Sequence, residues 1–158
     1  MNRRDVRGRG GGLFLAGLCA LVPASAGASC SLQGIVGLSF GAYNPGSAVP
    51  LDTVGSVGYR CDLLQLSVVN ISLSRGSSGS YAARQMQGPS SNTLSYNLYM
   101  DAAHLTVWGD GSSGTSRYGP VLPILGADVS LPVYGRIPAL QNVASGAYSD
   151  TVVVTMTF

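Results

Sequence analysis

Apolar and polar residues alternate in short stretches along this chain, and the clearest case is its last eleven residues, 148–158. The apolar positions there are Val152, Val154, Met156 and Phe158. Threonine occupies most of the positions between them, and only Val153 breaks a period of two that is typical of a half-buried β-strand. No charge, proline or glycine follows Asp150, so nothing in the sequence protects this strand from pairing as an open edge. The strand needs a partner, either in the same chain or in another one.

Seven further strands are predicted upstream, separated by turns rich in glycine, proline, serine and asparagine. They cover residues 34–40, 55–61, 65–74, 81–87, 94–100, 105–108 and 129–137, the last interrupted by Pro132. The proline-marked run that ends at Leu125 is expected to be an irregular connector. No long segment has the period of an amphipathic helix. Strands that recur about every 8 to 14 residues predict an all-β sandwich.

The first 28 residues have the pattern of a secretory signal peptide. Four arginines precede a short apolar run at 13–22, and Ala26-Gly27-Ala28 is typical of a cleavage site that would release Ser29. About ten apolar residues are too few to cross a bilayer, so no membrane span is expected. We therefore expect a signal peptide at 1–28 and one domain at 29–158. Arg3-Arg4 raises the twin-arginine route, but the apolar pair typical of that signal is missing, which favours the ordinary secretory route.

Cleavage changes the charge of the chain. The whole sequence has a formal net charge of +2, whereas the five arginines and six aspartates beyond residue 28 give a net charge of −1. Because no basic excess remains, nucleic acid and anionic membranes are not expected partners. The chain contains no lysine and no glutamate, which is more typical of an extracellular structural protein.

Two cysteines, Cys30 and Cys61, remain after the signal is removed, because Cys19 lies within it. In an exported protein an even pair predicts a disulfide, here worth about 3–4 kcal/mol in the chain-entropy model. A metal site would need more ligands, and His104 is the only histidine of the sequence. Neither a metal nor a cofactor is expected.

Two patterns could suggest an enzyme, and each has a plainer interpretation. Residues 109–114 match G-x-G-x-x-G, but this motif cradles phosphate only where a helix follows, so a polar loop is expected. His104 could join a serine and either Asp101 or Asp110 in a triad, yet no G-x-S-x-G elbow occurs. We expect a solvent-exposed histidine, no catalytic residues and no enzymatic activity.

Aromatic residues could form a glycan platform from Trp108, Tyr96 and Tyr99. The plainer interpretation places Trp108 and Tyr96 in the core and Tyr99 on the outside. Arg136 is a further candidate, although it could simply pair with an aspartate such as Asp150 or Asp101. The sequence leaves that pairing open.

Five ordered segments carry a resemblance to a known family. They are F-G-A-Y-N-P at 40–45, L-S-Y-N-L-Y at 94–99, V-W-G-D-G at 107–111, V-Y-G-R-I-P at 133–138 and G-A-Y-S-D-T at 146–151. Together they resemble the spore coat protein U domain family, which includes subunits of archaic chaperone-usher pili, over nearly all of residues 30–158. The motif residues of greatest interest are Tyr96, Trp108, Tyr134, Arg136, Tyr148 and Asp150.

The resemblance implies an immunoglobulin-like pilin β-sandwich that lacks one strand, in a secreted structural subunit of a surface fibre or of a spore or cell coat. Family members receive the missing strand from a periplasmic chaperone and later from a neighbouring subunit. The implied partners are thus that chaperone, an outer-membrane usher and other pilus or coat subunits. The implied location is the cell surface, reached through the periplasm, with roles in adhesion and biofilm formation. The chaperone would grip the last strand, which places Val152, Val154, Met156 and Phe158 along the groove.

One departure from the family pattern concerns the start of the domain. Shaft subunits carry a donor segment ahead of the first cysteine, whereas Cys30 follows the expected cleavage point by a single residue. At about 3.3 Å per residue, Ser29 alone supplies no strand, so a minor or terminal subunit is expected. The alternative is a self-contained binding or adhesion module whose loops at 76–80 and 109–118 contact a surface or a carbohydrate.

Overall fold

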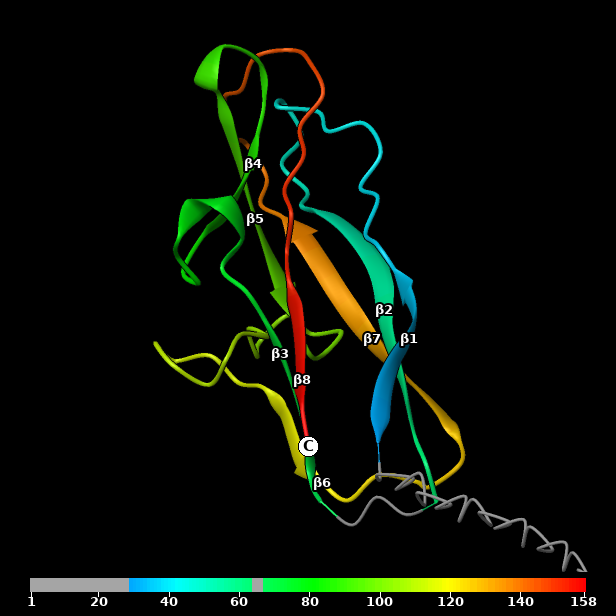
Figure 1. Ribbon diagram of the computed structural model, residues 1–158. Coiled ribbons are helices and arrows are strands. Elements are labelled where there is room, and N and C mark those ends of the chain that lie inside the picture. The colour runs from blue at the N-terminus through cyan, green and yellow to red at the C-terminus, as the bar shows by residue number, and fades with distance from the viewer. Residues whose placement is uncertain (1–28, 64–66) are drawn as a thin grey trace, which may run out of the picture.

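The computed structural model describes residues 29–63 and 67–158, so the expected signal peptide lies outside the described residues. The described chain is almost entirely strand, turn and loop (Figure 1). The strands are β1 (Cys30–Val36), β2 (Leu51–Cys61), β3 (Val69–Leu73), β4 (Arg84–Gln87), β5 (Thr93–Tyr99), β6 (Tyr118–Val121), β7 (Asp128–Ile137) and β8 (Val154–Thr157). Two short 3-10 turns are η1 (Gly76–Ser78) and η2 (Pro89–Ser91). Within these ranges, no helix has the length and apolar character that crossing a membrane requires.

The strands form two antiparallel sheets. The first has the order β1-β2-β7-β5-β4, and the second has the order β6-β3-β8. The chain thus folds as a sandwich, and β8, drawn in red in Figure 1, lies beside β3 at one edge of the smaller sheet. The predicted all-β sandwich is confirmed.

The longest ladder joins β2 to β7, from Leu51 opposite Ile137 to Arg60 opposite Asp128. It runs through Pro132, so the predicted interruption of this strand is wrong. The reason lies in the neighbouring strand, because β5 pairs with β7 only between Tyr134 and Arg136. Proline lacks an N–H, and Pro132 lies beyond the part of β7 that β5 contacts, where only β2 lies beside it.

The first strand differs from its predicted range of 34–40, because β1 begins at the first cysteine and ends at Val36. Its register against β2 shifts between Gln33 and Val36, and Gly34 adopts a left-handed φ of 59° there. Such a bulge bends the strand. Beyond it, residues 37–50 leave the sheet without regular strand structure.

The region between β5 and β7 also differs from its prediction. Residues 105–108 form only isolated bridges, Tyr99 to Val107 and Trp108 to Ser116, because the loop folds back on the end of β5. The expected irregular connector instead contains β6, which pairs with β3 despite carrying Pro120. β6 lies at the edge of its sheet and pairs with β3 alone, and edge strands tolerate a proline, which lacks a backbone N–H.

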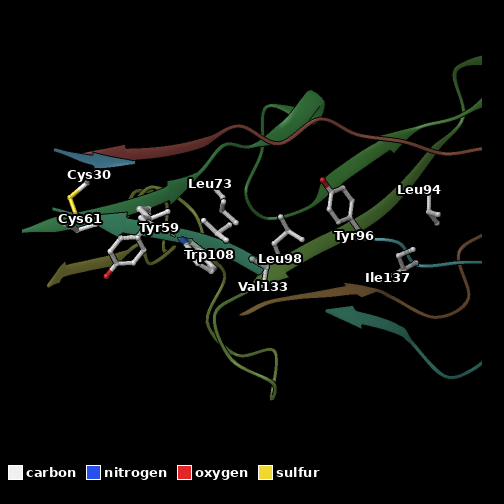
Figure 2. Packing of buried hydrophobic residues seen from close by; sticks show 13 residues of the cluster. Cys30, Tyr59, Cys61, Leu73, Leu94, Tyr96, Leu98, Trp108, Val133 and Ile137 are labelled. Atoms are coloured by element: carbon white, nitrogen blue, oxygen red, sulfur yellow. Dashed lines mark hydrogen bonds between the residues drawn. A yellow bond between two sulfur atoms is a disulfide. The ribbon is translucent and has the colours of Figure 1, made fainter. Parts of the chain in front are cut away.

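Buried side chains from both sheets form one apolar core (Figure 2). Trp108 and Tyr96 are 1% and 5% exposed, which confirms their predicted place in the core. The indole Nε1 of Trp108 donates a hydrogen bond of 3.1 Å to the carbonyl of Ile71. Cys30 and Cys61 form the predicted disulfide, and Figure 2 shows it at one end of the row of labelled core residues. The core therefore runs from a covalent link towards the opposite, loop-rich end of the sandwich.

Candidate functional site

A cavity of about 900 Å³ opens between the two sheets. Two segments that are far apart in the sequence form its sides, and we call them the N-terminal wall (residues 37–43) and the C-terminal wall (residues 148–154). Most of the floor is apolar and comes from the inner faces of both sheets, with these side chains: Val57, Leu73, Met86, Leu94, Tyr96, Leu98, Val133 and Ile137. Asp150 is the one charged side chain among the described residues that line it. The cavity is a long apolar groove.

Packing rather than pairing holds the N-terminal wall. Leu38 and Phe40 are half-buried and lie over Gly135, where an added Cβ would sit 2.8 Å from Cζ of Phe40. The ring of Phe40 also meets the ring of Tyr96 edge to face, with the centroids 6.1 Å apart. No backbone–backbone hydrogen bond involves residues 38–42 within the described part of the chain. This wall therefore has free main-chain donors and acceptors.

Hydroxyl groups add a few polar contacts at the same wall. Thr53 Oγ1 donates to the carbonyl of Ser39 at 2.9 Å. Tyr43 OH donates to the carbonyl of Pro138 at 3.0 Å and accepts from the backbone N–H of Gln141 at 2.7 Å. The bonds of Tyr43 hold the far end of the wall to the loop after β7, and the bond from Thr53 holds its middle to β2.

Backbone hydrogen bonds hold the C-terminal wall to both sheets. Ser149 exchanges two of them with Gln87 of β4, at 2.7 and 3.0 Å. Further along, the backbone N–H of Ser74 donates to the carbonyl of Val153, and the N–H of Val153 donates to Oγ of Ser74, both at 2.9 Å. The chain thus passes from the edge of the first sheet to the second. That crossing explains why β8 begins only at Val154 and not at residue 148.

Asp150 is the polar centre of the C-terminal wall. Its carboxylate accepts a hydrogen bond of 2.7 Å from Tyr96 OH and one of 2.9 Å from the backbone N–H of Ser77. Burial raises the pKa of Tyr96. The hydrogen bond to Asp150 raises it further, because the hydroxyl can donate that bond only while it keeps its proton. Tyr148, also in this wall, packs its ring against Gly88 and donates from its hydroxyl to the carbonyl of Ala144 at 2.8 Å.

Arg84 lies fully buried beneath this wall. Its guanidinium donates to the carbonyls of Ser74 and Trp108 and to Oδ1 of Asn97, at distances from 2.7 to 3.0 Å. Burial lowers the pKa of Arg84, while nearby Asp150 opposes that effect. An arginine keeps its proton even so, and the buried cation is therefore satisfied mainly by neutral acceptors.

The last strand leaves one of its edges free. β8 pairs with β3 from Asn70 opposite Thr157 to Leu73 opposite Val154, and it is the outermost strand of the described sheet. Of the four side chains predicted to face the groove, Val152 and Val154 line the cavity. Met156 packs against the core instead, and Phe158 lies outside the lining with 49% of its surface exposed.

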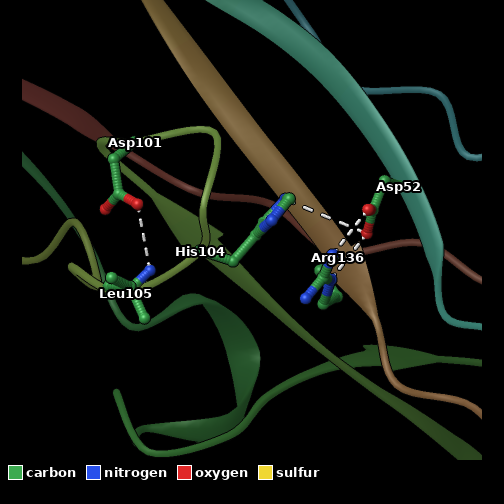
Figure 3. A network of polar contacts seen from close by, with 5 residues as sticks. All are labelled: Asp52, Asp101, His104, Leu105 and Arg136. Carbon is green, nitrogen blue, oxygen red and sulfur yellow. Dashed lines mark hydrogen bonds and ion pairs between the residues drawn. The ribbon is translucent and has the colours of Figure 1, made fainter.

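A second cluster, drawn in Figure 3, lies on the face of β7 opposite Val133, Gly135 and Ile137, and none of its residues lines the groove. Arg136 donates two hydrogen bonds of 2.7 Å to the carboxylate of Asp52, so it does pair with an aspartate, although the partner is neither Asp101 nor Asp150. Asp52 and Arg136 stand directly opposite each other on β2 and β7. The bond to Arg136 lowers the pKa of Asp52.

His104 belongs to the same cluster, and its predicted exposure to solvent is wrong. The side chain is only 6% exposed, because its ring lies edge to face against Tyr99 and Tyr134. Its Nε2 is 3.9 Å from Oδ1 of Asp52 (Figure 3). The backbone explains the position, since Asp101 accepts hydrogen bonds from the N–H groups of the two residues after His104 and so curls the loop over the sheet.

The residues considered for catalysis are not brought together. Asp101 binds its own loop, and Asp110 accepts two hydrogen bonds from Ser112. Residues 109–116 form a turn that no helix follows, which agrees with the expected polar loop. In the two described ranges, no group of three or more histidine, cysteine, aspartate or glutamate side chains is placed to hold a metal ion.

Sequence reasoning found one wall of the groove and missed the other. The sequence predicts a strand over 34–40, whereas β1 ends at Val36 and the non-strand segment beyond it places Leu38 and Phe40 over Gly135. Arg84 was also missed, although a signal existed. Arg84 lies two residues before Met86 in a predicted strand, so the two side chains share one face of that strand. Because Met86 is apolar, that face is the one expected to point inward.

Comparison with known proteins agrees with this geometry. The family model of the Spore Coat Protein U domain matches residues 17–155. Protein U of Myxococcus xanthus is 40% identical over 150 residues, which cover 85% of this chain and 80% of that protein. A similar solved structure is a chain of the CsuC-CsuE chaperone-tip adhesion subunit pre-assembly complex from archaic chaperone-usher Csu pili of Acinetobacter baumannii.

That structure has a TM-score of 0.54 and 21% sequence identity, and the match covers 83% of this chain but only 40% of the other. At this identity the likeness concerns the fold, which is the immunoglobulin-like sandwich of chaperone-usher pilins. The sequence matches, in contrast, span most of the chain and include its motif residues. The chain therefore belongs to the spore coat protein U domain family.

Proposed function

We propose that this protein is a secreted structural subunit of a surface fibre or coat, and that a strand from another chain completes its sandwich. The observation that carries the proposal is the groove between the two walls. Its floor is apolar, and both walls have main-chain groups that no described residue engages. An extended strand is the structure that satisfies both features at once, through ladder hydrogen bonds and alternate side chains.

The chemistry of the groove also limits the strand that fits. A charge placed on the apolar floor would lose its hydration without gaining a partner, because Asp150 is already bonded to Tyr96 and Ser77. The inserted face should therefore carry uncharged, apolar side chains at every second position. Each would remove apolar surface from water, at about 25 cal/mol per Å².

An open groove of this kind is a hazard before assembly, because an unpaired edge invites pairing with the wrong chain. A periplasmic chaperone is a suitable first partner, and other pilus or coat subunits, delivered through an outer-membrane usher, are the later ones. The similarity to a chain from a chaperone-tip adhesion subunit complex supports this sequence of partners. Passage through the periplasm to the cell surface follows from this sequence of partners.

The test is the thermal stability of the exported chain, 29–158, with and without strand-like peptides. We would use a pool of twelve-residue peptides with alanine, valine or leucine at every second position and threonine between. A pool of the same composition with contiguous apolar residues is the control. At about 100 times the dissociation constant, binding adds about 2.7 kcal/mol and raises the melting temperature by about 10 °C.

A pair of variants locates the binding. Val152→Asp places a charge in the groove and should abolish the gain, whereas Val153→Asp alters a side chain that is 57% exposed and should leave it unchanged. Cooperative unfolding at the same temperature with either pool would contradict the proposal. That result would favour the alternative function, a self-contained binding module.

A further inference from the structure

Phe40 forms a ridge across the floor of the groove. Its ring lies over Gly135 of β7 and reaches Tyr96 of β5, the neighbouring strand. Gly135 faces the interior, since it is buried between Val133 and Ile137 on the same face of β7. Both flanking residues line the groove, whereas Gly135 does not, because Leu38 and Phe40 cover it.

The ridge separates two apolar sections. One section contains Val133 and the other contains Ile137, which lie on either side of Gly135 on the same face of β7 and both line the groove. Val133 and Ile137 are four residues apart on one strand, which corresponds to about 13 Å. Only a glycine at position 135 leaves room for the ring, because a methyl group there would overlap both Leu38 and Phe40.

The two sections fix the spacing of a complementary strand. A strand that enters between packed sheets runs within about 30° of their strands, and its side chains face the floor at every second residue. Two bulky side chains four residues apart then reach the two sections. The inward side chain midway between them meets the ring of Phe40.

We infer that Phe40 is the specificity-determining residue of the groove: it selects a strand with two bulky apolar side chains four residues apart and a small one midway between them. The inference rests on the proposed function, because it specifies the strand that the groove accepts. Phe40 acts by occupying space, so its effect depends on the volume of one side chain of the incoming strand and not on the overall hydrophobicity of that strand.

The experiment uses two nine-residue peptides that differ at one position. Both carry two valines four residues apart, with threonine or serine at the remaining positions, and the midway residue is alanine in one peptide and leucine in the other. Their affinities for the exported chain are measured by titration calorimetry. We expect the alanine peptide to bind at least about tenfold more tightly, because leucine must displace a packed ring.

Variants at the ridge then test its cause. Phe40→Ala should remove or reverse the preference for the alanine peptide, and Phe40→Leu should reduce it in part. The milder variant guards against loss of folding in the other. Leu105→Ala is the matched control, because Leu105 is 82% exposed and lies outside the groove, and it should keep the tenfold preference.

The outcomes separate the two claims. If neither peptide binds the folded wild-type chain, the groove accepts no strand, and the proposed function fails together with the inference. If both peptides bind equally, or if the preference survives in both Phe40 variants, only the inference is overturned. A preference that follows the volume of residue 40 supports it.

Discussion

The two walls of the groove are held in different ways. The C-terminal wall is tied by backbone hydrogen bonds to β4 and to Ser74, and Asp150 connects it to Tyr96 and to η1. The N-terminal wall rests on Leu38 and Phe40 and on hydroxyl contacts near its far end. Directional bonds hold one position, whereas apolar packing tolerates small displacements. The comparison therefore indicates a preformed wall and an adaptable one.

This difference matters for strand capture. A preformed edge offers main-chain groups in a fixed register, which reduces the ordering that binding has to accomplish. The opposite wall can shift slightly to close on the strand, except over Gly135, where the packed ring of Phe40 fills the space. Hydrogen exchange should show the contrast, with slower exchange in residues 149–153 than in residues 38–42.

The largest expected effect comes from the disulfide, which links residues 31 positions apart and lies at the start of β1, the strand that leads into the N-terminal wall. Cys30→Ser with Cys61→Ser should lower the free energy of unfolding by about 3–4 kcal/mol, because the unfolded chain regains loop entropy. Denaturant titration measures the loss. In this variant, amide hydrogen exchange should accelerate more in the N-terminal wall than in the C-terminal wall. Equal acceleration would show that the disulfide stabilises both walls to the same extent.

Asp150→Ala should destabilise the protein by about 2–3 kcal/mol. It removes a charged acceptor and leaves Tyr96 OH and the N–H of Ser77 without their partner. Thermal unfolding measures the cost. Asp62→Ala, which removes an exposed carboxylate bonded to Ser29 Oγ, is the control and should cost under about 0.5 kcal/mol. Similar losses in both variants would argue against a polar clamp at the C-terminal wall.

Gly135→Ala tests the packing of the N-terminal wall. The added methyl group overlaps Leu38 and Phe40, so the variant should be less stable by about 1–3 kcal/mol. Gly37→Ala is matched to it, because an added Cβ at that position meets no atom within 4 Å. Chemical denaturation compares the two. If Gly135→Ala is as stable as Gly37→Ala, the wall moves aside at no cost.

The smallest effect concerns the outer face of the first sheet. Asp52 has a lowered pKa in the folded chain, so its pairing with Arg136 stabilises the protein above the ordinary carboxyl pKa and loses that effect as pH falls through the folded value. The pair is partly exposed, and we expect under about 1 kcal/mol. The stability difference between wild type and Asp52→Asn should be present at pH 7 and shrink as the pH falls below the ordinary carboxyl pKa. A difference that persists in acid would rule out the ion pair as its source.

Local patterning was sufficient for much of the fold. β5 and β7 lie within one residue of their predicted ranges, β2 begins four residues before its predicted start, and the disulfide was predicted from two cysteines in a chain expected to be exported. β6 was missed because Gly119-Pro120 has little strand propensity, and long-range pairing with β3 outweighs that preference.

The groove was harder to predict than the strands. Its C-terminal side was visible as an open apolar strand, but the inward turn of Phe40 depends on the bulge and on a glycine nearly a hundred residues away. The partner of Arg136 depends likewise on the register between β2 and β7, which no local pattern specifies. Contacts of this kind are properties of the assembled sheets.

The disulfide has a mechanical consequence. It joins the first residue of β1 to the last residue of β2, and β2 pairs with β7 from Leu51 to Arg60, the residue next to Cys61. A force that pulls on the N-terminal wall along the chain reaches β1 and then passes through the sulfur atoms into the longest ladder of the sandwich. Peeling β1 from the sheet therefore cannot detach the wall from the domain, and a bound strand that drags on this wall is resisted by a covalent anchor.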